Sequence, residues 1–252
     1  MKDNIIEFLY PKKTEPILKD VFPIRTIQNM PQWYKNLKHT TKQKTIKGCR
    51  PFSDALTAGY ILKMPQDFYI KHNYTQGDKK DTSYRFPYGI EPNAIYDLKL
   101  NVNTDVPAMH DIKQLGDKKG GCPFIEKNKN LPFYKIVNPF MIKTAPGYSC
   151  LFTPPLNNRD DRFEIISSIV DTDTFPTYIN FPIIINGDKY PVLETIIKKG
   201  TPYAQIIPFK REGWKKEIKE TNENYKSIGV LQVASKLIHN YKTLFWNKKS
   251  WK

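Results

Sequence analysis

The sequence predicts a mainly β protein with a helical C-terminal arm, and three observations lead to this prediction. All 20 prolines fall within the first 210 residues of the 252-residue chain, where each would remove a helical hydrogen bond and clash with the preceding turn. From residue 134 onward, short apolar runs alternate with turn residues, as in β-sandwiches and barrels. After residue 211, apolar residues recur at steps of three, four and seven, which is the helical period.

The expected elements follow the chain in order. Short strands broken by proline are predicted between residues 5 and 27, then a short helix at 31–37. A helical turn and a strand are expected over 53–62, and another strand over 67–71. The dense β part predicts strands at 134–138, 142–144, 148–153, 163–166, 177–185 and 204–209. Asn186-Gly187 predicts a hairpin turn, because Asn-Gly tolerates positive φ.

These elements suggest a jelly-roll or distorted β-barrel body over residues 1–210. This body can be divided further into an irregular N-terminal part, 1–130, and a β core, 131–210. The arm spans residues 211–252, with Trp214 and Ile218 opening its periodic apolar pattern. Gly229 within this pattern favours a break or kink.

Charge and composition limit the functions that the protein could have. The formal net charge is +15, which favours an anionic partner such as nucleic acid, an acidic protein surface or nucleotide phosphates. The competing interpretation is a lysine-rich solvated surface. No apolar run approaches the roughly 18 residues of a membrane span, and the N-terminus does not read as a secretion signal. Three cysteines without a C-x-x-C pair argue against a zinc site or disulfide framework and suit a reducing compartment.

Three motifs in the β core stand in a distinctive order. They are a Pro-Gly turn and strand at 145–154, an Asp-x-Asp-x-aromatic turn at 171–175, and a Gly-x-x-x-Ala-Gln strand at 200–205. In this order they resemble the core of the dUTPase and dCTP deaminase superfamily over roughly residues 140–210. The resemblance implies a nucleotide-binding or Mg²⁺-dependent nucleotide-hydrolysing enzyme. Asp171 and Asp173 would then be its acid or metal residues, Gln205 would lie near the phosphates, and Tyr60 or Phe175 would stack on the base.

The chain also departs from that pattern. The arginine- and serine-rich segment that holds the phosphates is missing, and Ile61 stands where the first motif has an aspartate. Alternation along a strand would place Asp171 and Asp173 on one face, where they could bind a cation or activate a water. The structural alternative is that they are turn carboxylates that cap backbone N–H groups. No catalytic or metal residue is therefore assigned, and no cofactor is expected outside the enzyme alternative.

A second resemblance runs along most of the chain. The segments 31–35, 46–52, 146–149, 170–173 and 200–211 together resemble an uncharacterised protein family of tailed bacteriophages, the T4-like phages of marine bacteria. This resemblance implies a viral origin. We therefore expect a non-catalytic bacteriophage protein, a virion structural or assembly component, located in the virion or the host cytoplasm. Its expected partners are other phage proteins or further copies of itself, and no membrane.

The end of the arm carries the expected partner contacts. Aromatic rings lie among lysines there, an arrangement that suits cation–π contacts and stacking on bases. The candidate contact residues are Lys242, Trp246, Lys248, Lys249 and Trp251. The alternative is that one face of the arm covers the β body while the other is solvated. Nucleic-acid binding is the second functional alternative, after the dUTPase-like enzyme.

Overall fold

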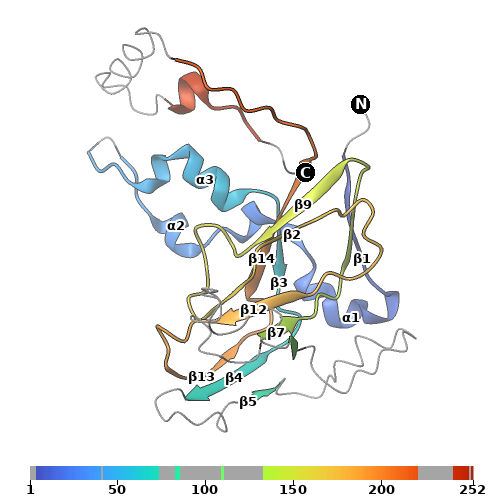
Figure 1. Cartoon of the computed structure of the whole chain (residues 1–252). Helices are drawn as coiled ribbons and strands as arrows, with labels where there is room; N and C mark the ends of the chain where they lie inside the picture. The colour runs from blue at the N-terminus through green and yellow to red at the C-terminus, as the bar shows by residue number, and fades with distance from the viewer. Residues whose placement is uncertain are drawn as a thin grey trace.

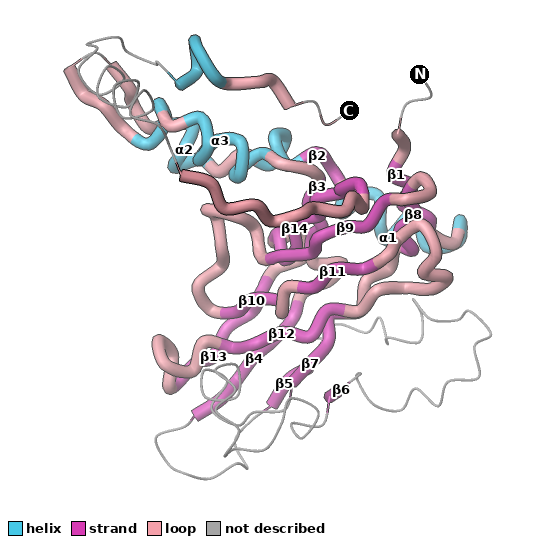
Figure 2. Tube along the Cα trace, turned by 45° about the horizontal axis from the view of Figure 1, so that its top comes forward, coloured by secondary structure: helices cyan, strands magenta, loops and turns pink. Residues whose placement is uncertain are grey.

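The structure is a computed structural model that describes residues 4–40, 42–73, 83–85, 109–110, 133–220, 241–249 and 251. Antiparallel β-sheets are the main regular structure in this part of the chain, and short helices lie beside them (Figures 1 and 2). The predicted mainly β fold with a small helical part is therefore confirmed.

The widest sheet in the described part has five strands in the order β11-β9-β14-β3-β2. Its centre is β14 (Pro202–Lys210), which pairs with β9 (Tyr148–Thr153) on one edge and β3 (Tyr60–Lys63) on the other. The outer strands are β11 (Ser168–Val170) and β2 (Ile24–Arg25). Since β2 and β3 come from the first 130 residues, the N-terminal part and the β core share one sheet.

Three smaller ladders complete the body. One has the order β10 (Phe163–Ile165), β12 (Phe181–Ile185), β7 (Phe133–Ile136) and β6 (Met109–His110). Another has the order β13 (Val192–Ile197), β4 (Phe68–Asn73) and β5 (Ser83–Arg85). The third pairs β1 (Ile6–Leu9) with β8 (Met141–Thr144). Within the described ranges these ladders do not close into a barrel, which corrects the barrel form of the prediction.

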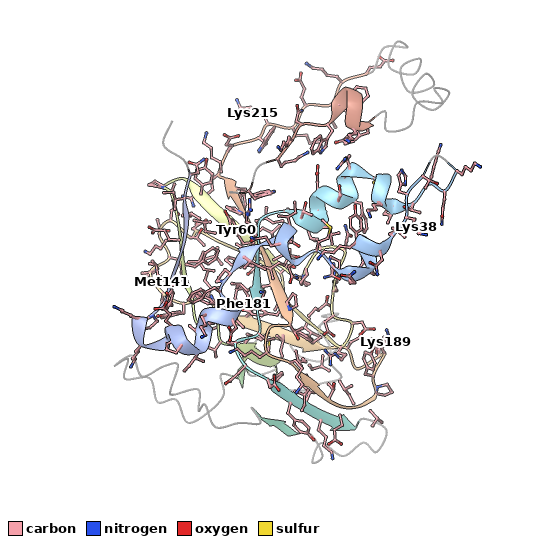
Figure 3. The ribbon with its side chains drawn as sticks, turned by 180° about the vertical axis from the view of Figure 1, so that it is seen from behind. Lys38, Tyr60, Met141, Phe181, Lys189 and Lys215 are labelled. Carbon is pink, nitrogen blue, oxygen red and sulfur yellow. The ribbon has the colours of Figure 1, made fainter. Side chains whose placement is uncertain are left out.

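Aromatic side chains join the sheets through one common core. The ring of Phe181 from β12 lies 5.3 Å from Phe152 of β9 and 5.6 Å from Tyr203 of β14, measured between centroids. All three residues are at most 1% exposed, so each side chain contributes roughly 1.5–3 kcal/mol through burial. Figure 3 shows Phe181 in the middle of the body. The aromatic-rich composition thus supplies the contacts between sheets.

The structure of the N-terminal segment differs from the prediction, which placed only strands there. Between β1 and β2 lie three consecutive helical turns, η1 (Lys12–Thr14), α1 (Glu15–Leu18) and η2 (Lys19–Val21). Pro16 occupies the first turn of α1, where its missing N–H has no helical partner to lose. Buried Leu18 and Val21 anchor these turns to the core.

Two further helices lie side by side above the five-stranded sheet, α2 (Gln32–Asn36) and α3 (Arg50–Thr57) (Figure 1). Shorter helical turns precede each of them, η3 (Thr26–Asn29) and η4 (Ile46–Gly48). Gly59 follows α3 with a φ of +62°, a conformation that glycine adopts easily at a helix end. It reverses the chain from α3 into β3.

Two predicted features differ from the structure. Residues 187–189 form a turn, but the strands on either side of it, β12 and β13, belong to different sheets, and Gly187 lacks the positive φ that a tight Asn-Gly hairpin needs. Residues 212–220 have no regular secondary structure, although the periodicity assigned them to the arm helix. Trp214 and Ile218 are 90% and 81% exposed, so no neighbouring layer covers an apolar helix face there.

The rest of the arm is described only near its end. A single π-helical turn spans Tyr241–Phe245, and residues 246–249 continue without regular structure. The periodic residues between Tyr225 and Ile238 lie outside the described residues. In the described ranges, no helix combines the length and the apolarity needed to cross a bilayer.

Candidate functional site

The predicted aspartates lie in a turn where three distant segments meet. Thr174 and Phe175 donate their backbone N–H groups to the carbonyl of Asp171, at 3.1 and 2.8 Å. Thr172, fully buried, points inward, where its hydroxyl lies 2.7 Å from that of Thr144 and 3.3 Å from the Cys150 sulfur. Because β11 ends at Val170, the two aspartates do not alternate along a strand as predicted.

The Pro-Gly turn lies directly beside the aspartate turn. Gly147 has a φ of +84°, and its N–H donates to the Asp173 carboxylate at 2.8 Å. Its carbonyl accepts the backbone N–H of Arg211 at 2.9 Å. Ser149, two residues further along, donates its hydroxyl to Asp171 at 2.6 Å. The first two motifs noted in the sequence therefore do come together.

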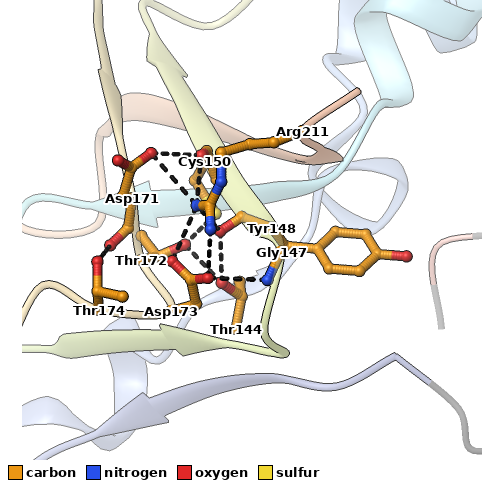
Figure 4. Close-up of polar contacts among 10 residues, drawn as sticks. Thr144, Gly147, Tyr148, Cys150, Asp171, Thr172, Asp173, Thr174 and Arg211 are labelled. Atoms are coloured by element: carbon orange, nitrogen blue, oxygen red, sulfur yellow. Dashed lines mark hydrogen bonds and ion pairs between the residues drawn. The ribbon is translucent and has the colours of Figure 1, made fainter. Parts of the chain in front are cut away.

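Arg211 binds both aspartates from the end of β14 (Figure 4). Its guanidinium makes two hydrogen bonds to the Asp173 carboxylate, at 2.9 and 2.5 Å, and lies 3.3 Å from the nearer oxygen of Asp171. It also donates to the Tyr148 carbonyl at 2.9 Å. We call these residues, Gly147, Ser149, Asp171, Asp173 and Arg211, the aspartate–arginine cluster.

The two carboxylates differ in exposure. The Asp173 side chain is only 6% exposed, whereas that of Asp171 is 62% exposed. Hydrogen bonds from Arg211, and after them from the Gly147 N–H, hold the pKa of Asp173 far below its usual range. The same contact raises the pKa of Arg211. Asp173 is therefore an ionised, structurally engaged group, which matches the structural alternative of a carboxylate that accepts backbone N–H groups.

The predicted ligand-binding residues make contacts within the fold. Gln205 is fully buried in β14, where its side-chain oxygen accepts the Leu156 N–H at 2.8 Å and its NH₂ group donates to the carbonyls of Ala55 and Ala58, at 3.0 and 2.7 Å. The side-chain amide of Gln205 therefore forms its hydrogen bonds with the backbone of other segments. Half-buried Tyr60 packs against Phe8 with centroids 5.6 Å apart, and Phe175 packs against the core. Their ligand roles remain predictions.

A groove of about 1320 Å³ lies elsewhere, between the α2–α3 layer and the C-terminal segment, residues 241–249 and 251. Arg25 and Arg50 line it from the body, as do Lys35, Lys38 and Lys47. Lys248 and Lys249 line it from the C-terminal segment. Asp54 is the one carboxylate among the lining residues that the structure describes. We call this space the basic groove.

The C-terminal segment docks onto α3 through Trp246. The indole N–H of Trp246 donates to Asp54 at 2.8 Å, and Lys249 donates to the same carboxylate oxygen at 2.8 Å. The guanidinium carbon of Arg50 lies 5.2 Å from the centre of the Trp246 ring, within range of a cation–π contact. At the end of the segment, Arg25 donates to the carbonyl of Trp251 at 3.3 Å.

Three of the five predicted partner-contact residues thus contact the body of the same chain, namely Trp246, Lys249 and Trp251. Lys242 and Lys248 are exposed. Sequence reasoning missed Arg211, Arg50 and Asp54, because nothing local marks them. Their roles depend on contacts between residues 38 to 196 positions apart.

Comparison of the chain with models of known protein families, with curated proteins and with solved structures gives no match. Across the residues that the structure describes, no group of three or more histidine, cysteine, aspartate or glutamate side chains is arranged to hold a metal ion.

Proposed function

We propose that the protein is a non-catalytic component of a tailed bacteriophage, a virion structural or assembly protein that works through its basic groove and C-terminal segment. One observation carries its non-catalytic part, while the viral origin rests on the resemblance of the sequence segments described above. The residues that the enzyme alternative would use, Asp171 and Asp173, are held by Arg211 in the aspartate–arginine cluster. Asp173 would have to lose this partner before it could bind Mg²⁺ or orient a water, and Asp171 already shares its carboxylate with Arg211 and Ser149.

The cluster serves the fold instead. It links the β8–β9 turn, the turn after β11 and the end of β14 through hydrogen bonds of 2.5 to 3.3 Å. Buried Gln205 likewise links β14 to the end of α3 and to the loop at Leu156. Residues that resemble an enzyme's motifs therefore join separate segments, which supports a scaffold that presents surfaces to partners.

The test has two parts. Mass spectrometry of purified particles of the phage that encodes this chain should find it, or find it in assembly intermediates. The purified protein should not hydrolyse dUTP or dCTP at enzyme-like rates with Mg²⁺ present. Hydrolysis that is lost in Asp171→Asn and Asp173→Asn would reverse the proposal in favour of the dUTPase-like enzyme.

Nucleotide binding can be tested separately by thermal shift. A ligand present at about 100 times its Kd should add roughly 2.7 kcal/mol to the free energy of unfolding. The proposal predicts no such shift with free nucleoside triphosphates, with or without Mg²⁺.

A further inference from the structure

The basic groove has a charge imbalance that its own contacts do not resolve. Seven lysine and arginine side chains line it against the single carboxylate of Asp54, which already accepts from Trp246 and Lys249. Lys35, Lys38 and Lys248 form no ion pair with any carboxylate in the described part of the chain. Like charges gathered around one space repel each other, and a bound polyanion would relieve this repulsion.

Elsewhere on the described surface, several lysines have acidic partners. Lys71 pairs with Glu194 at 3.1 Å, Lys198 with Asp67 at 2.9 Å, and Lys210 with Glu212 at 2.8 Å. Lys189 likewise pairs with Asp161. In the groove, by contrast, seven cations share the carboxylate of Asp54, the one carboxylate among the described lining residues.

Aromatic rings lie in the same groove as these cations. Trp246 and Trp251 line it and are half-buried, whereas Tyr34 also lines it but is only 4% exposed and packs against Trp33 and Phe52. Cations that bind phosphates, next to rings that can stack on bases, are the two components of single-strand recognition. An acidic protein segment would use the lysines but would have less use for the rings.

The shape of the groove favours a single strand over a duplex. The α2–α3 layer forms one wall and the C-terminal segment, pinned at Asp54 and Arg25, forms the other (Figure 1). A strand can lie between these walls with its bases unpaired, whereas a duplex presents its bases only along its grooves. The volume of about 1320 Å³ exceeds that of an ordinary small-molecule pocket.

From these observations we infer that the basic groove binds single-stranded nucleic acid, with Lys35, Lys38 and Lys248 on the phosphates and the groove's aromatic rings against the bases. The inference deepens the proposed function and rests on it, since it names the partner of a non-catalytic interaction protein.

The experiment measures fluorescence anisotropy of a labelled oligothymidylate of about 15 nucleotides, within the range covered by single-strand binding sites, over a series of salt concentrations. For single strands, the slope of log K against log salt is about −0.7 for each phosphate contact. The combined variant Lys35→Ala, Lys38→Ala, Lys248→Ala should therefore bind more weakly and reduce the steepness of the slope by about 2.

A matched variant separates the groove from the overall charge. Lys12→Ala, Lys19→Ala, Lys143→Ala removes the same number of charges, from η1, η2 and β8. Met141, at the start of β8, lies across the molecule from Lys38 (Figure 3). This variant should keep the slope of the unmodified protein. An equal loss of slope in both variants would overturn the inference in favour of diffuse attraction.

Two competitors define the partner. A duplex of the same length should displace the single strand poorly, and so should polyglutamate. Efficient displacement by polyglutamate would overturn the inference in favour of an acidic protein partner. No binding of the oligonucleotide at low salt would also overturn it. If the chain is then still found in phage particles and hydrolyses no nucleotide, the proposed function stands and only this inference fails.

Discussion

At the scale of single residues, two glycines with positive φ differ in what surrounds them. Gly59 has a φ of +62°, and a Cβ atom there would lie 1.9 Å from the backbone carbonyl oxygen of Ile206. Gly147 has a φ of +84°, but a Cβ atom would meet nothing within 4 Å. The same substitution at the two sites therefore separates backbone strain from steric overlap.

We expect Gly59→Ala to destabilise the protein by about 3 kcal/mol or more, since strain adds to a clash with fixed backbone. Gly147→Ala, as the control, should cost only about 1–2 kcal/mol, the price of the left-handed conformation alone. Urea unfolding measures both. Equal losses at the two positions would show that β14 can move away from Gly59.

The aspartate–arginine cluster gives a pH dependence with a defined sign. The pKa of Asp173 is lowered in the folded protein by Arg211 and the Gly147 N–H. A lowered folded pKa gives stability that is fully present above the unfolded pKa, about 3.9, and is lost as pH falls below it. The melting temperature of the unmodified protein should therefore exceed that of Asp173→Asn at neutral pH.

This difference should narrow below about pH 4, where the Asp173 carboxylate begins to take up a proton in the unfolded chain while it stays ionised in the folded protein. Asp171→Asn serves as the comparison, because Asp171 is 62% exposed and its contact with Arg211 is longer. It should lower the melting temperature less than Asp173→Asn at every pH. A gap for Asp173→Asn that stays constant down to low pH would contradict an ionised Asp173.

At the scale of elements, β14 links three parts of the chain through one side chain. Buried Gln205 binds the backbone at Ala55, Ala58 and Leu156. Gln205→Leu keeps the size but leaves these three groups unpaired, at roughly 1–3 kcal/mol for each buried group. We expect a loss of at least about 3 kcal/mol in urea unfolding.

Gln32→Leu is a suitable control for Gln205→Leu. Gln32 is exposed and donates only to Asn36, one turn along α2. Surface substitutions of this kind stay within about 0.5 kcal/mol of the unmodified protein. If the free energy of unfolding falls equally in the two variants, the result would show that water replaces the contacts of Gln205.

The elements also show what local sequence can and cannot predict. β9 occupies its predicted range, and the α2 and α3 regions were expected, because proline, turn residues and short apolar runs act locally. The prediction misses the helical turns between Lys12 and Val21 because it treats each proline as a strand break, although a proline also stands in the first turn of α1. The hairpin predicted at residues 186–188 is wrong about which strands pair. β13 pairs with β4 instead, and the residues of β4 lie more than 100 positions away in the sequence.

The candidate sites, too, can be predicted from the sequence only in part. Asp171 and Asp173 were marked by their motif, and the motif does meet the Pro-Gly turn as its order suggested. Arg211, which decides what the aspartates do, lies 38 positions from Asp173. The basic groove combines lysines near residue 40 with others near 248, and no local pattern connects those two regions.

At the scale of the whole molecule, the end of the chain returns to the body at α3. Asp54 accepts from both Trp246 and Lys249, so its replacement by alanine removes two contacts at once. We expect Asp54→Ala to release the C-terminal segment and to speed tryptic cleavage at Lys248 and Lys249 by about tenfold, which corresponds to about 1.4 kcal/mol of lost docking.

Asp20→Ala is the control for this release. Asp20 is 68% exposed, pairs with Lys199 at 3.6 Å and contributes nothing to the C-terminal segment. Its variant should be cleaved at the original rate with an unchanged melting temperature. Unchanged cleavage in Asp54→Ala would mean that Arg25 and Arg50 hold the segment by themselves.

Arg211 stands where β14 gives way to the exposed chain that leads toward the C-terminus, and its backbone and side chain are both fastened to the neighbouring turns. Arg211 therefore anchors the exposed segment to the sheet. Tension applied to the exposed segment, as when a partner holding Trp214 moves away, would be borne by the guanidinium and its carboxylates before it could peel β14 from β9. When the exposed segment is pulled, the contacts of Arg211 should break first, while the hydrogen bonds between β14 and β9 remain intact.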